Sequence, residues 1–439
     1  MSTDARPFGF WTATALIVGS MIGSGIFLLP VAIAPYGWIG VIAWLVSITG
    51  AVMIGYAIAR LGQKMPEQTG AVAITAAVLG PWVGVLVGWA YWISTWTTIA
   101  AIAGAAVSYL GVFGPLLIAT PLNGALATIA LIWLFTATNL LGARAAGRVQ
   151  VVTTLLKLLP LIAVVAILAW LGVTGQAHAP AWPGTSAGYG GLTAAVTLTL
   201  FPLLGFECAG MISERVRNPA RTVMRATMVG TVVTGLLYIL VSSGIAFAIP
   251  AEQVAASSAP FALFVETFWG RGAGLLVAAF AALAAIGALN GWVLLQGEVP
   301  LGMARAGLLP GWFGRVNMRD VPVRVLLLSS VLSSLLVLST ASRSLSGAFQ
   351  FAALLTTCTV LWLYAAICVA ALLRRVAVLP AGLGLAFTGW AMVGAGLEAS
   401  GWGLALTLTG APVYWWARRG AGVARAVTRD LVRGPPGDV

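Results

Sequence analysis

The stretch GSMIGSGIFLLP, residues 19–30, decides the fold of this chain. It places Gly19, Gly23 and Gly25 in one apolar run that ends at Pro30. Each glycine weakens a helix by about 1 kcal/mol relative to alanine, so a straight helix facing lipid is a poor explanation of this composition. We therefore expect the helix to be interrupted here.

A second stretch, FPLLGFECAG at residues 201–210, carries a similar interruption. Gly205 follows Gly23 by 182 residues, which corresponds to five helices with their loops. Interrupted segments at corresponding places in two halves are typical of transporters built from an inverted repeat, with the binding site near the middle of the membrane. The alternative is close packing of small residues between helices. Two interruptions at matching positions favour the repeat.

The composition indicates a membrane protein. Of the 439 residues, 60% are hydrophobic and 8% are charged, whereas about a quarter of a soluble domain is charged. These proportions exclude soluble, disordered, collagen-like and coiled-coil chains. Apolar runs long enough to cross about 30 Å of hydrocarbon recur along the whole length. We therefore expect an all-α polytopic membrane protein.

Hydropathy, with Gly, Pro and Arg as punctuation, predicts twelve transmembrane helices, the first of them retained and not cleaved as a signal peptide. They cover residues 8–34, 37–62, 80–111, 121–142, 148–173, 189–214, 223–249, 269–303, 323–342, 347–373, 378–399 and 402–417. The third and eighth ranges are over-long, which requires tilt or extension beyond the bilayer. The longest connection is a polar stretch at about 304–322. The expected organisation is a single transporter domain over 1–439, with repeats at 8–173 and 189–373, two last helices at 378–417 and a basic tail at 418–439.

The basic residues predict the orientation. Of the 23 lysines and arginines, 20 fall on one side of the predicted helices, while Arg271 and Arg343 fall on the other and Lys157 lies within a helix. Because basic residues concentrate on the cytoplasmic side, both termini are expected in the cytoplasm, and the chain is expected in a cell membrane, the bacterial inner membrane. The same bias accounts for the net charge of +12. It predicts contact with the lipid bilayer and no nucleic-acid partner.

An interrupted helix offers a particular chemistry. Unwinding releases backbone N–H groups at the start of one half-helix and C=O groups at the end of the other. The N–H groups and the positive dipole end suit a carboxylate, and the carbonyl oxygens suit an ammonium group. An α-amino acid carries both, so the backbone alone predicts an amino acid or amine ligand.

At residues 19–30 the chain resembles the amino acid–polyamine–organocation (APC) transporter superfamily, and within it the arginine/agmatine antiporter group. Further similar stretches are GWAYWISTWTTIAAI (88–102), TLTLFPLLGFECAGMISERVRNPART (197–222), ASSAPFALFVETFWG (256–270) and GALNGWVLLQGEVPLGMARAGLLP (287–310). The resemblance implies a LeuT-like fold, in which helices 1 and 6 of a five-plus-five inverted repeat are broken. It also implies an amino acid exchanger that works by alternating access.

The resemblance implies a substrate site at the two breaks. The substrate carboxylate would sit on the amides of Ser24 and Gly25, and the amino group would face carbonyl groups near Ile22, Phe201 and Leu204. Phe201 would act as an aromatic gate, where the antiporter group has tryptophan. Trp292 matches the aromatic residue that stacks on a guanidinium group, an attraction that reaches about 2 kcal/mol in a desolvated site.

One departure concerns the third predicted helix. Ile99 occupies the place of an asparagine near the guanidinium group in the antiporters, and Ser94, Thr95 and Thr98 are the polar candidates nearby. The loss of this amide removes a hydrogen-bonding partner for arginine. Arginine/agmatine exchange therefore competes with proton-coupled or sodium-independent transport of neutral amino acids, and a membrane sensor without transport is a remote alternative.

Two buried charges are candidates for coupling or gating. Lys157 resembles the fifth-helix lysine of other superfamily members, and we expect it to tether the broken first helix; proton coupling and a snorkelling anchor are the alternatives. Glu207 matches a glutamate proposed for proton sensing or gating in the family, and the alternative is a protonated acid bound to backbone. No cofactor, metal site or catalytic set of residues is expected, so the chain is predicted not to be an enzyme. Proton coupling and a homodimer stay open.

Overall fold

The computed structural model describes residues 9–23, 25–68, 70–141, 156–176, 188–207, 216 and 219–418, and this part of the chain is predominantly helical. The helices are α1 (Phe10–Met21), α2 (Gly25–Ile33), η2 (Ala34–Tyr36), α3 (Trp38–Lys64), α4 (Ala71–Leu79), α5 (Pro81–Leu110), η3 (Pro115–Ile118), α6 (Pro121–Leu140), α8 (Leu158–Val173), α9 (Gly188–Leu200), η4 (Phe201–Leu203), α10 (Pro219–Ala248), α11 (Ala251–Ala256), α12 (Pro260–Trp269), α13 (Arg271–Arg305), α14 (Val323–Ser339), α15 (Leu345–Leu373), α16 (Val378–Gly394) and α17 (Gly396–Leu408).

The apolar helices agree with a polytopic membrane protein. Within the described residues, six helices are long and apolar enough to cross a membrane, and the number rises to eight if each of two bent pairs forms one span. Three shorter apolar helices lie at Leu158–Val173, Gly190–Leu203 and Val323–Ser339. Every one of the twelve predicted ranges overlaps a helix. The count of twelve spans and the LeuT-like topology stay predictions.

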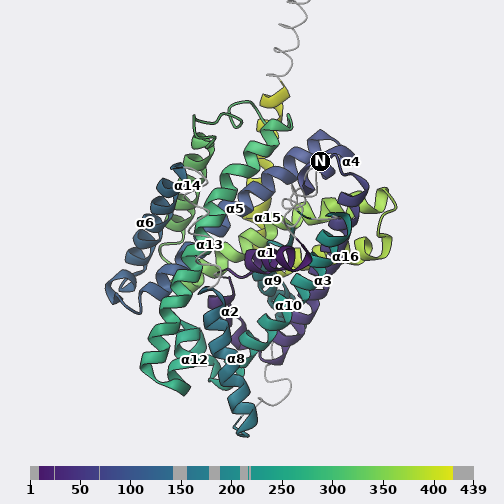
Figure 1. Ribbon diagram of the computed structural model, residues 1–439. Coiled ribbons are helices and arrows are strands. Elements are labelled where there is room, and N and C mark those ends of the chain that lie inside the picture. Colours follow the sequence, from purple (N-terminus) through teal and green to yellow (C-terminus); the bar gives the residue numbers. More distant parts are fainter. Residues whose placement is uncertain are drawn as a thin grey trace, which may run out of the picture.

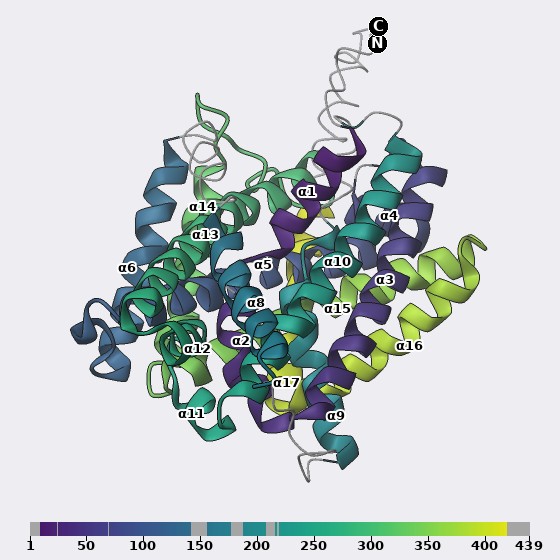
Figure 2. The ribbon, with the colours of Figure 1, turned by 60° about the horizontal axis from the view of Figure 1, so that its bottom comes forward.

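Two very long helices lie at the centre of the bundle. α5 and α13 are continuous over 30 and 35 residues, or about 45 and 52 Å, as the over-long predicted ranges suggested. α5 packs against α13 and α15. Of its apolar 18-residue stretch, 94% is buried inside the protein. α6 and α14 lie along one flank of this centre, while α3 and α16 lie along the opposite flank (Figures 1 and 2).

Both predicted interruptions are present. α1 ends at Met21 and α2 begins at Gly25, with a bend of 52° between the first helix and the segment Gly25–Tyr36. α9 passes into the short 3-10 turn η4, after which Leu204 is extended and Gly205 takes a φ of 110°. This φ lies in a region that glycine enters at little cost. The glycine-rich stretches therefore mark the ends of the helices correctly.

The connections contain helices that the sequence did not predict. α4 precedes α5, and α11 and α12 lie between α10 and α13. The predicted boundary near residue 399 is also wrong, because α16 ends at Gly394 and the chain turns by 112° into the segment that begins at Gly396. Gly396 has a φ of 79°, which ends the helix there.

Candidate functional site

The two interruptions lie against each other. Ser20 Oγ is 3.3 Å from Gly205 O. A methyl group added to Gly205 would lie 3.2 Å from Ser20 O, and one added to Gly25 would lie 3.1 Å from the Phe201 ring. Two backbones approach this closely only where side chains are absent. The glycines therefore bring together segments that are far apart in the sequence.

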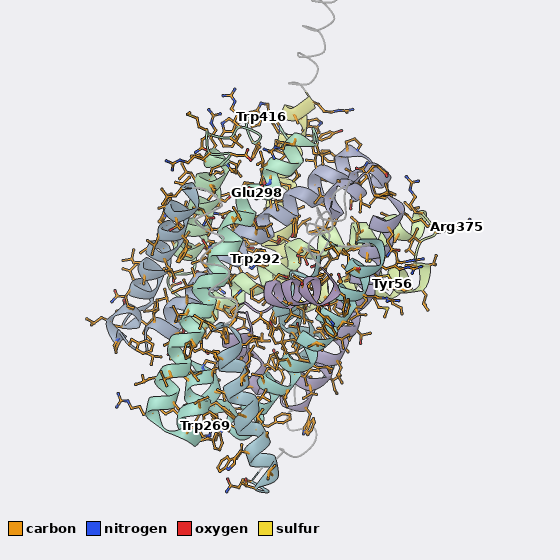
Figure 3. All side chains as sticks on the ribbon, in the orientation of Figure 1. Tyr56, Trp269, Trp292, Glu298, Arg375 and Trp416 are labelled. Carbon is orange, nitrogen blue, oxygen red and sulfur yellow. The ribbon has the colours of Figure 1, made fainter. Side chains whose placement is uncertain are left out.

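A cavity lies where the interruptions meet. Its lining consists of Ser20, Met21, Gly23, Gly25, Thr98, Ile102, Phe201, Pro202, Leu204 and Trp292. The centres of water molecules can occupy about 20 Å³ of it, which is room for one or two waters. Figure 3 places Trp292 between Glu298 and Trp416 towards one end of the molecule and Trp269 towards the other. We call this space the central cavity.

Five of the ten predicted substrate-binding residues line the central cavity, namely Gly25, Thr98, Phe201, Leu204 and Trp292. The other candidates on α5 do not line it. Ser94 and Thr95 bind carbonyl oxygens one turn earlier in their own helix, and Ile99 is buried among the apolar side chains of Ala288, Leu289 and Val293. Ile22 is 1% exposed and does not line the cavity either. Ser24 lies outside the described residues.

The other half of the lining was not predicted from the sequence. Ile102 follows Thr98 by four residues and therefore shares its face of α5, so the helical period starting from Thr98 could have found it. Pro202 lies in the second interruption and Gly23 in the first, although neither was named as a site residue. Ser20 and Met21 precede the first interruption by one turn or less. Ser20 and Met21 lie beside the interruption and not within it, so the sequence marked them as lining residues less clearly than Gly23 and Pro202.

Lys157 lies at the start of α8 and is 2% exposed. Its Nζ donates a hydrogen bond of 3.3 Å to Gly19 O, near the end of α1. Tyr238 of α10 donates a hydrogen bond of 2.9 Å to Met21 O. The carbonyl oxygens at the end of an interrupted helix have no partner within that helix. Side chains from two other helices therefore supply donors at the first interruption.

Glu207 lies just beyond the second interruption and is 8% exposed. Its Oε2 accepts hydrogen bonds from Gly205 N (2.9 Å) and from the Tyr364 hydroxyl (2.8 Å). The Tyr91 hydroxyl is 3.4 Å from Oε1. The carboxyl group thus connects the second interruption with α5 and α15. Both tyrosines were absent from the predicted site, because nothing local in the sequence marks them.

Comparison with known proteins identifies the family. The amino acid permease family matches residues 8–414. The chain belongs to this family. Its relatives include the cadaverine/lysine antiporter of Escherichia coli K12, which is 34% identical over 79% of this chain and 78% of its own length. The putrescine transporter PotE of Haemophilus influenzae is 28% identical over 94% of this chain and 98% of its own length. PotE of E. coli K12 is 28% identical over 79% of each chain.

Membership places this permease in the APC superfamily, as the sequence motifs indicated, and makes it a membrane transporter and not an enzyme. Within the described residues, no group of three or more His, Cys, Asp or Glu side chains could hold a metal ion. The chemical groups that the permease presents at the central cavity are interrupted backbone, apolar side chains, two hydroxyl groups and the indole of Trp292.

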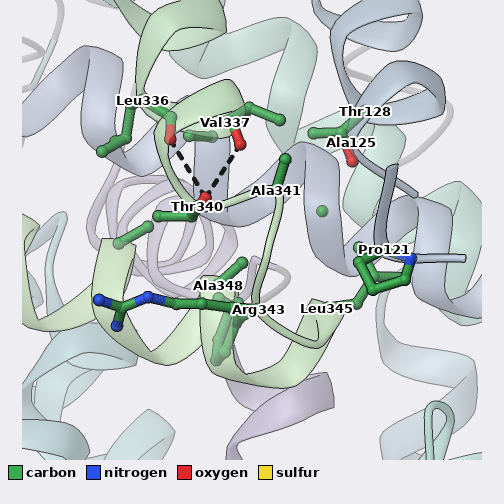
Figure 4. A pocket seen from close by; sticks show the side chains of 14 residues that line it. Pro121, Ala125, Thr128, Leu336, Val337, Thr340, Ala341, Arg343, Leu345 and Ala348 are labelled. Carbon is green, nitrogen blue, oxygen red and sulfur yellow. Dashed lines mark hydrogen bonds between the residues drawn. The ribbon is translucent and has the colours of Figure 1, made fainter. Parts of the chain in front are cut away.

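A second hollow lies on the other face of α5, between α6, α14 and α15. Its walls are mostly apolar and include Ala100, Gly104 and Ala125. Figure 4 shows Arg343 extending away from the hollow; its guanidinium donates to Glu398 Oε1 at 2.5 Å and lies over the Phe351 ring. The hydroxyl of Thr340 bonds within α14. Unlike the central cavity, this hollow is not lined by residues of either interruption.

Proposed function

We propose that this permease exchanges a cationic amino acid for an amine, with the central cavity as its substrate site. The observation that carries the proposal is the position of Trp292, whose side chain shares one cavity with both interrupted segments. An indole face attracts a cation by up to about 2 kcal/mol in a desolvated site. The lysine/cadaverine exchange named for the E. coli relative is chemistry of this kind.

The backbone supports the amino acid end of the substrate. α2 begins at Gly25, and the N–H groups at a helix start, together with its positive dipole end, favour a carboxylate. α1 ends at Met21, and the carbonyl groups at a helix end favour an ammonium group. We infer that the α-carboxylate and α-amino group lie between α1 and α2, and that the cationic side chain lies over Trp292.

Transport by this site requires the cavity to change size. Its present volume holds about one or two waters, which is less than a lysine or a cadaverine needs. Phe201 lines the cavity and packs edge-to-face against Phe349 of α15, with the ring centroids 5.8 Å apart. We infer that Phe201 is the gate, and that Lys157 and Glu207 couple its movement to the two interruptions.

Counterflow in proteoliposomes tests the exchange. Vesicles loaded with cadaverine or agmatine should take up labelled lysine or arginine, and vesicles without internal substrate should not. Trp292→Leu should weaken binding of the cationic substrate about tenfold, because stacking is lost. Trp269→Leu is the matched control, since Trp269 is 49% exposed and lies far from the cavity. Failure of every amino acid and amine to exchange would refute the proposal.

A proton-coupled permease for neutral amino acids is the second candidate. It is favoured by the lining of the central cavity, in which none of the described residues is charged, and by the buried Ile99 in place of an amide. The same vesicles distinguish the two functions. Uptake of a neutral amino acid that is driven by a pH gradient, without internal substrate, would support this second candidate and contradict the exchanger.

We also propose that both termini face the cytoplasm of a bacterial inner membrane. Met318, in the connection between α13 and α14, is fully exposed. Leu116, in η3 between α5 and α6, is 81% exposed. Met318→Cys should react with a membrane-impermeant maleimide only in opened cells, whereas Leu116→Cys should react in intact cells. The unsubstituted chain is the control for its own cysteines. The reverse pattern would invert the topology.

A further inference from the structure

α13 carries two buried amide side chains close to Trp292. Asn290 is 1% exposed and Gln296 is 0% exposed. Asn290 leaves the helix about 200° away from Trp292, while Gln296 leaves it about 40° away and one turn further on, because 3.6 residues make a turn. The two amides therefore flank the tryptophan along the helix and lie at different angles around it. Together they can define both the rotation of α13 and its height.

Each amide is bound to a neighbouring helix. Asn139 of α6 donates from Nδ2 to Asn290 Oδ1 at 3.1 Å, and the same nitrogen donates to Phe135 O at 2.8 Å. Gln296 donates from Nε2 to Ser330 Oγ of α14 at 3.1 Å. α6, α13 and α14 lie side by side in both ribbon views (Figures 1 and 2). The tryptophan-bearing helix is thus tied to two neighbours.

These two ties reach the same face of α6. Ser330 Oγ is 2.7 Å from Thr136 Oγ1, and Thr136 lies one turn before Asn139. α6 therefore contacts α13 directly through Asn139 and indirectly through Ser330. A rotation of α13 by one residue would break both connections at once. We call Thr136, Asn139, Asn290, Gln296 and Ser330 the polar seam.

The polar seam is a poor device for stability. Asn139 Oδ1 and Gln296 Oε1 are buried and have no hydrogen-bond partner among the residues that the structure describes, and a buried polar atom without a partner keeps its full desolvation cost. Apolar side chains of similar volume would avoid this cost. In coiled coils, a buried asparagine lowers stability but fixes the register of the helices. The same trade, stability lost for a fixed register, accounts for the amides in this apolar interface.

We infer that the polar seam positions Trp292, by fixing the rotation and register of α13 so that the indole points into the central cavity. Asn139, Asn290 and Gln296 are then residues that determine substrate preference without touching substrate. The inference rests on the proposed function, because it takes Trp292 to be the residue that reads the substrate cation.

The test compares apolar replacements of the seam with a distant control. Asn139→Leu/Asn290→Leu removes the first tie without leaving a single amide behind, and Gln296→Leu removes the second. Trp44→Phe is the control, since Trp44 Nε1 donates to Ser242 Oγ at 3.1 Å in an equally buried contact between α3 and α10. The purified full chain is used, and the readouts are the thermal midpoint and the ratio of Kd values for lysine and a neutral amino acid of similar length.

The expected result is a selective one. The double leucine variant should keep its thermal midpoint and lose the preference for the cation about five- to tenfold, and Gln296→Leu should lose part of it. Adding Trp292→Leu to the double variant should cause no further loss, because both changes remove the same contact. The control should lower the midpoint and leave the Kd ratio unchanged.

Two other outcomes are distinguishable. An unchanged Kd ratio in the seam variants, with a ratio reduced by Trp292→Leu alone, would overturn the positioning role and leave the proposed function standing. No effect of Trp292→Leu on the ratio would overturn the proposed role of the tryptophan itself, and this inference with it. If the double variant does not fold, Asn139→Ser with Gln296→Met offers a milder pair with the same expected loss of preference.

Discussion

The two interruptions of this permease resemble each other in sequence, but one is held by hydrogen-bond donors and the other by an acceptor. At the first, the Lys157 ammonium group donates to Gly19 O and the Tyr238 hydroxyl donates to Met21 O. At the second, the Glu207 carboxyl group accepts from Gly205 N. One interruption is stabilised through its carbonyl oxygens and the other through an amide hydrogen. The backbone of a broken helix offers both kinds of group, and the side chains nearby select which kind is bound.

Lys157 and Glu207, which are both buried, therefore act at different interruptions. The two ion pairs found within the described residues join Arg305 with Asp320 and Arg343 with Glu398, so neither involves Lys157 or Glu207. An ionisable group inside a membrane protein is costly and usually has a function. Lys157 contacts one interruption and Glu207 the other, so the two side chains can be replaced independently. The following variants compare them, from the largest expected effect to the smallest.

Gly205→Ala should cause the largest loss. The φ of 110° is strained for alanine, and the new methyl group would lie 3.2 Å from Ser20 O; a cost of about 1–3 kcal/mol in stability follows. Gly23→Ala is the control in the other interruption, because its methyl group would meet Ala288 Cβ at an ordinary 3.5 Å, and it should change stability by less than about 1 kcal/mol. Chemical or thermal unfolding in detergent measures both. Equal losses would mean that the two glycines have the same role.

Lys157→Met should impair transport more than Tyr238→Phe. The lysine contributes a charged donor, worth about 1.5–3 kcal/mol, whereas a neutral hydroxyl contributes about 0.5–1.5 kcal/mol. We expect the counterflow rate of Lys157→Met to fall about tenfold while Kd stays within about threefold, because the lysine contacts the interruption and not the central cavity. Radioligand binding and counterflow on the same preparation separate the two quantities. Loss of binding with intact exchange would move Lys157 into the substrate site.

The two tyrosines at Glu207 should differ from each other. Tyr364→Phe removes the hydrogen bond of 2.8 Å, and Tyr91→Phe removes the longer contact of 3.4 Å. The first should cost about 1 kcal/mol in stability and the second less than about 0.5 kcal/mol, because hydrogen bonds weaken with distance. Unfolding of each variant gives the comparison. The reverse order would show that the Tyr91 hydroxyl is the principal donor to this acid.

Ser20→Ala should have the smallest effect. The hydroxyl lies 2.7 Å from Ile17 O in its own helix and 3.3 Å from Gly205 O across the interruption. Since the long contact is the one that joins the two interruptions, its loss should change stability by less than about 0.5 kcal/mol. A counterflow rate more than about threefold lower would instead make this hydroxyl a functional link between them.

The positions of the interruptions were predictable because their causes are local. Glycine and proline act on the backbone of their own residue. GSMIGSGIFLLP and FPLLGFECAG therefore predict the breaks without any knowledge of the helices packed around them. The long helices α5 and α13 followed from uninterrupted apolar runs for the same reason. The short helices α4, α11 and α12 lie in connections that hydropathy does not resolve, and they were missed.

The lining of the central cavity was half predictable. Gly25, Phe201, Leu204 and Trp292 lie in or beside motifs, and they line the central cavity together with Thr98. On α5, Ile99 was chosen from the resemblance, but Ile102 lines the cavity, although both belong to the same buried apolar cluster. Side chains three residues apart lie only about 60° from each other around a helix. Only the packing of α5 against its neighbours decides which of the two faces the cavity.

The sequence by itself determined that this chain is a helical membrane protein, where its helices break and to which family it belongs, because composition, glycine and proline act through local backbone energies and through the bilayer. The tertiary structure alone decided which groups complete the breaks. Lys157, Tyr238 and Tyr364 reach backbone or carboxyl oxygens 138 or more residues away in the chain. A hydrogen bond depends on distance and angle in space, and no property of a single residue encodes them.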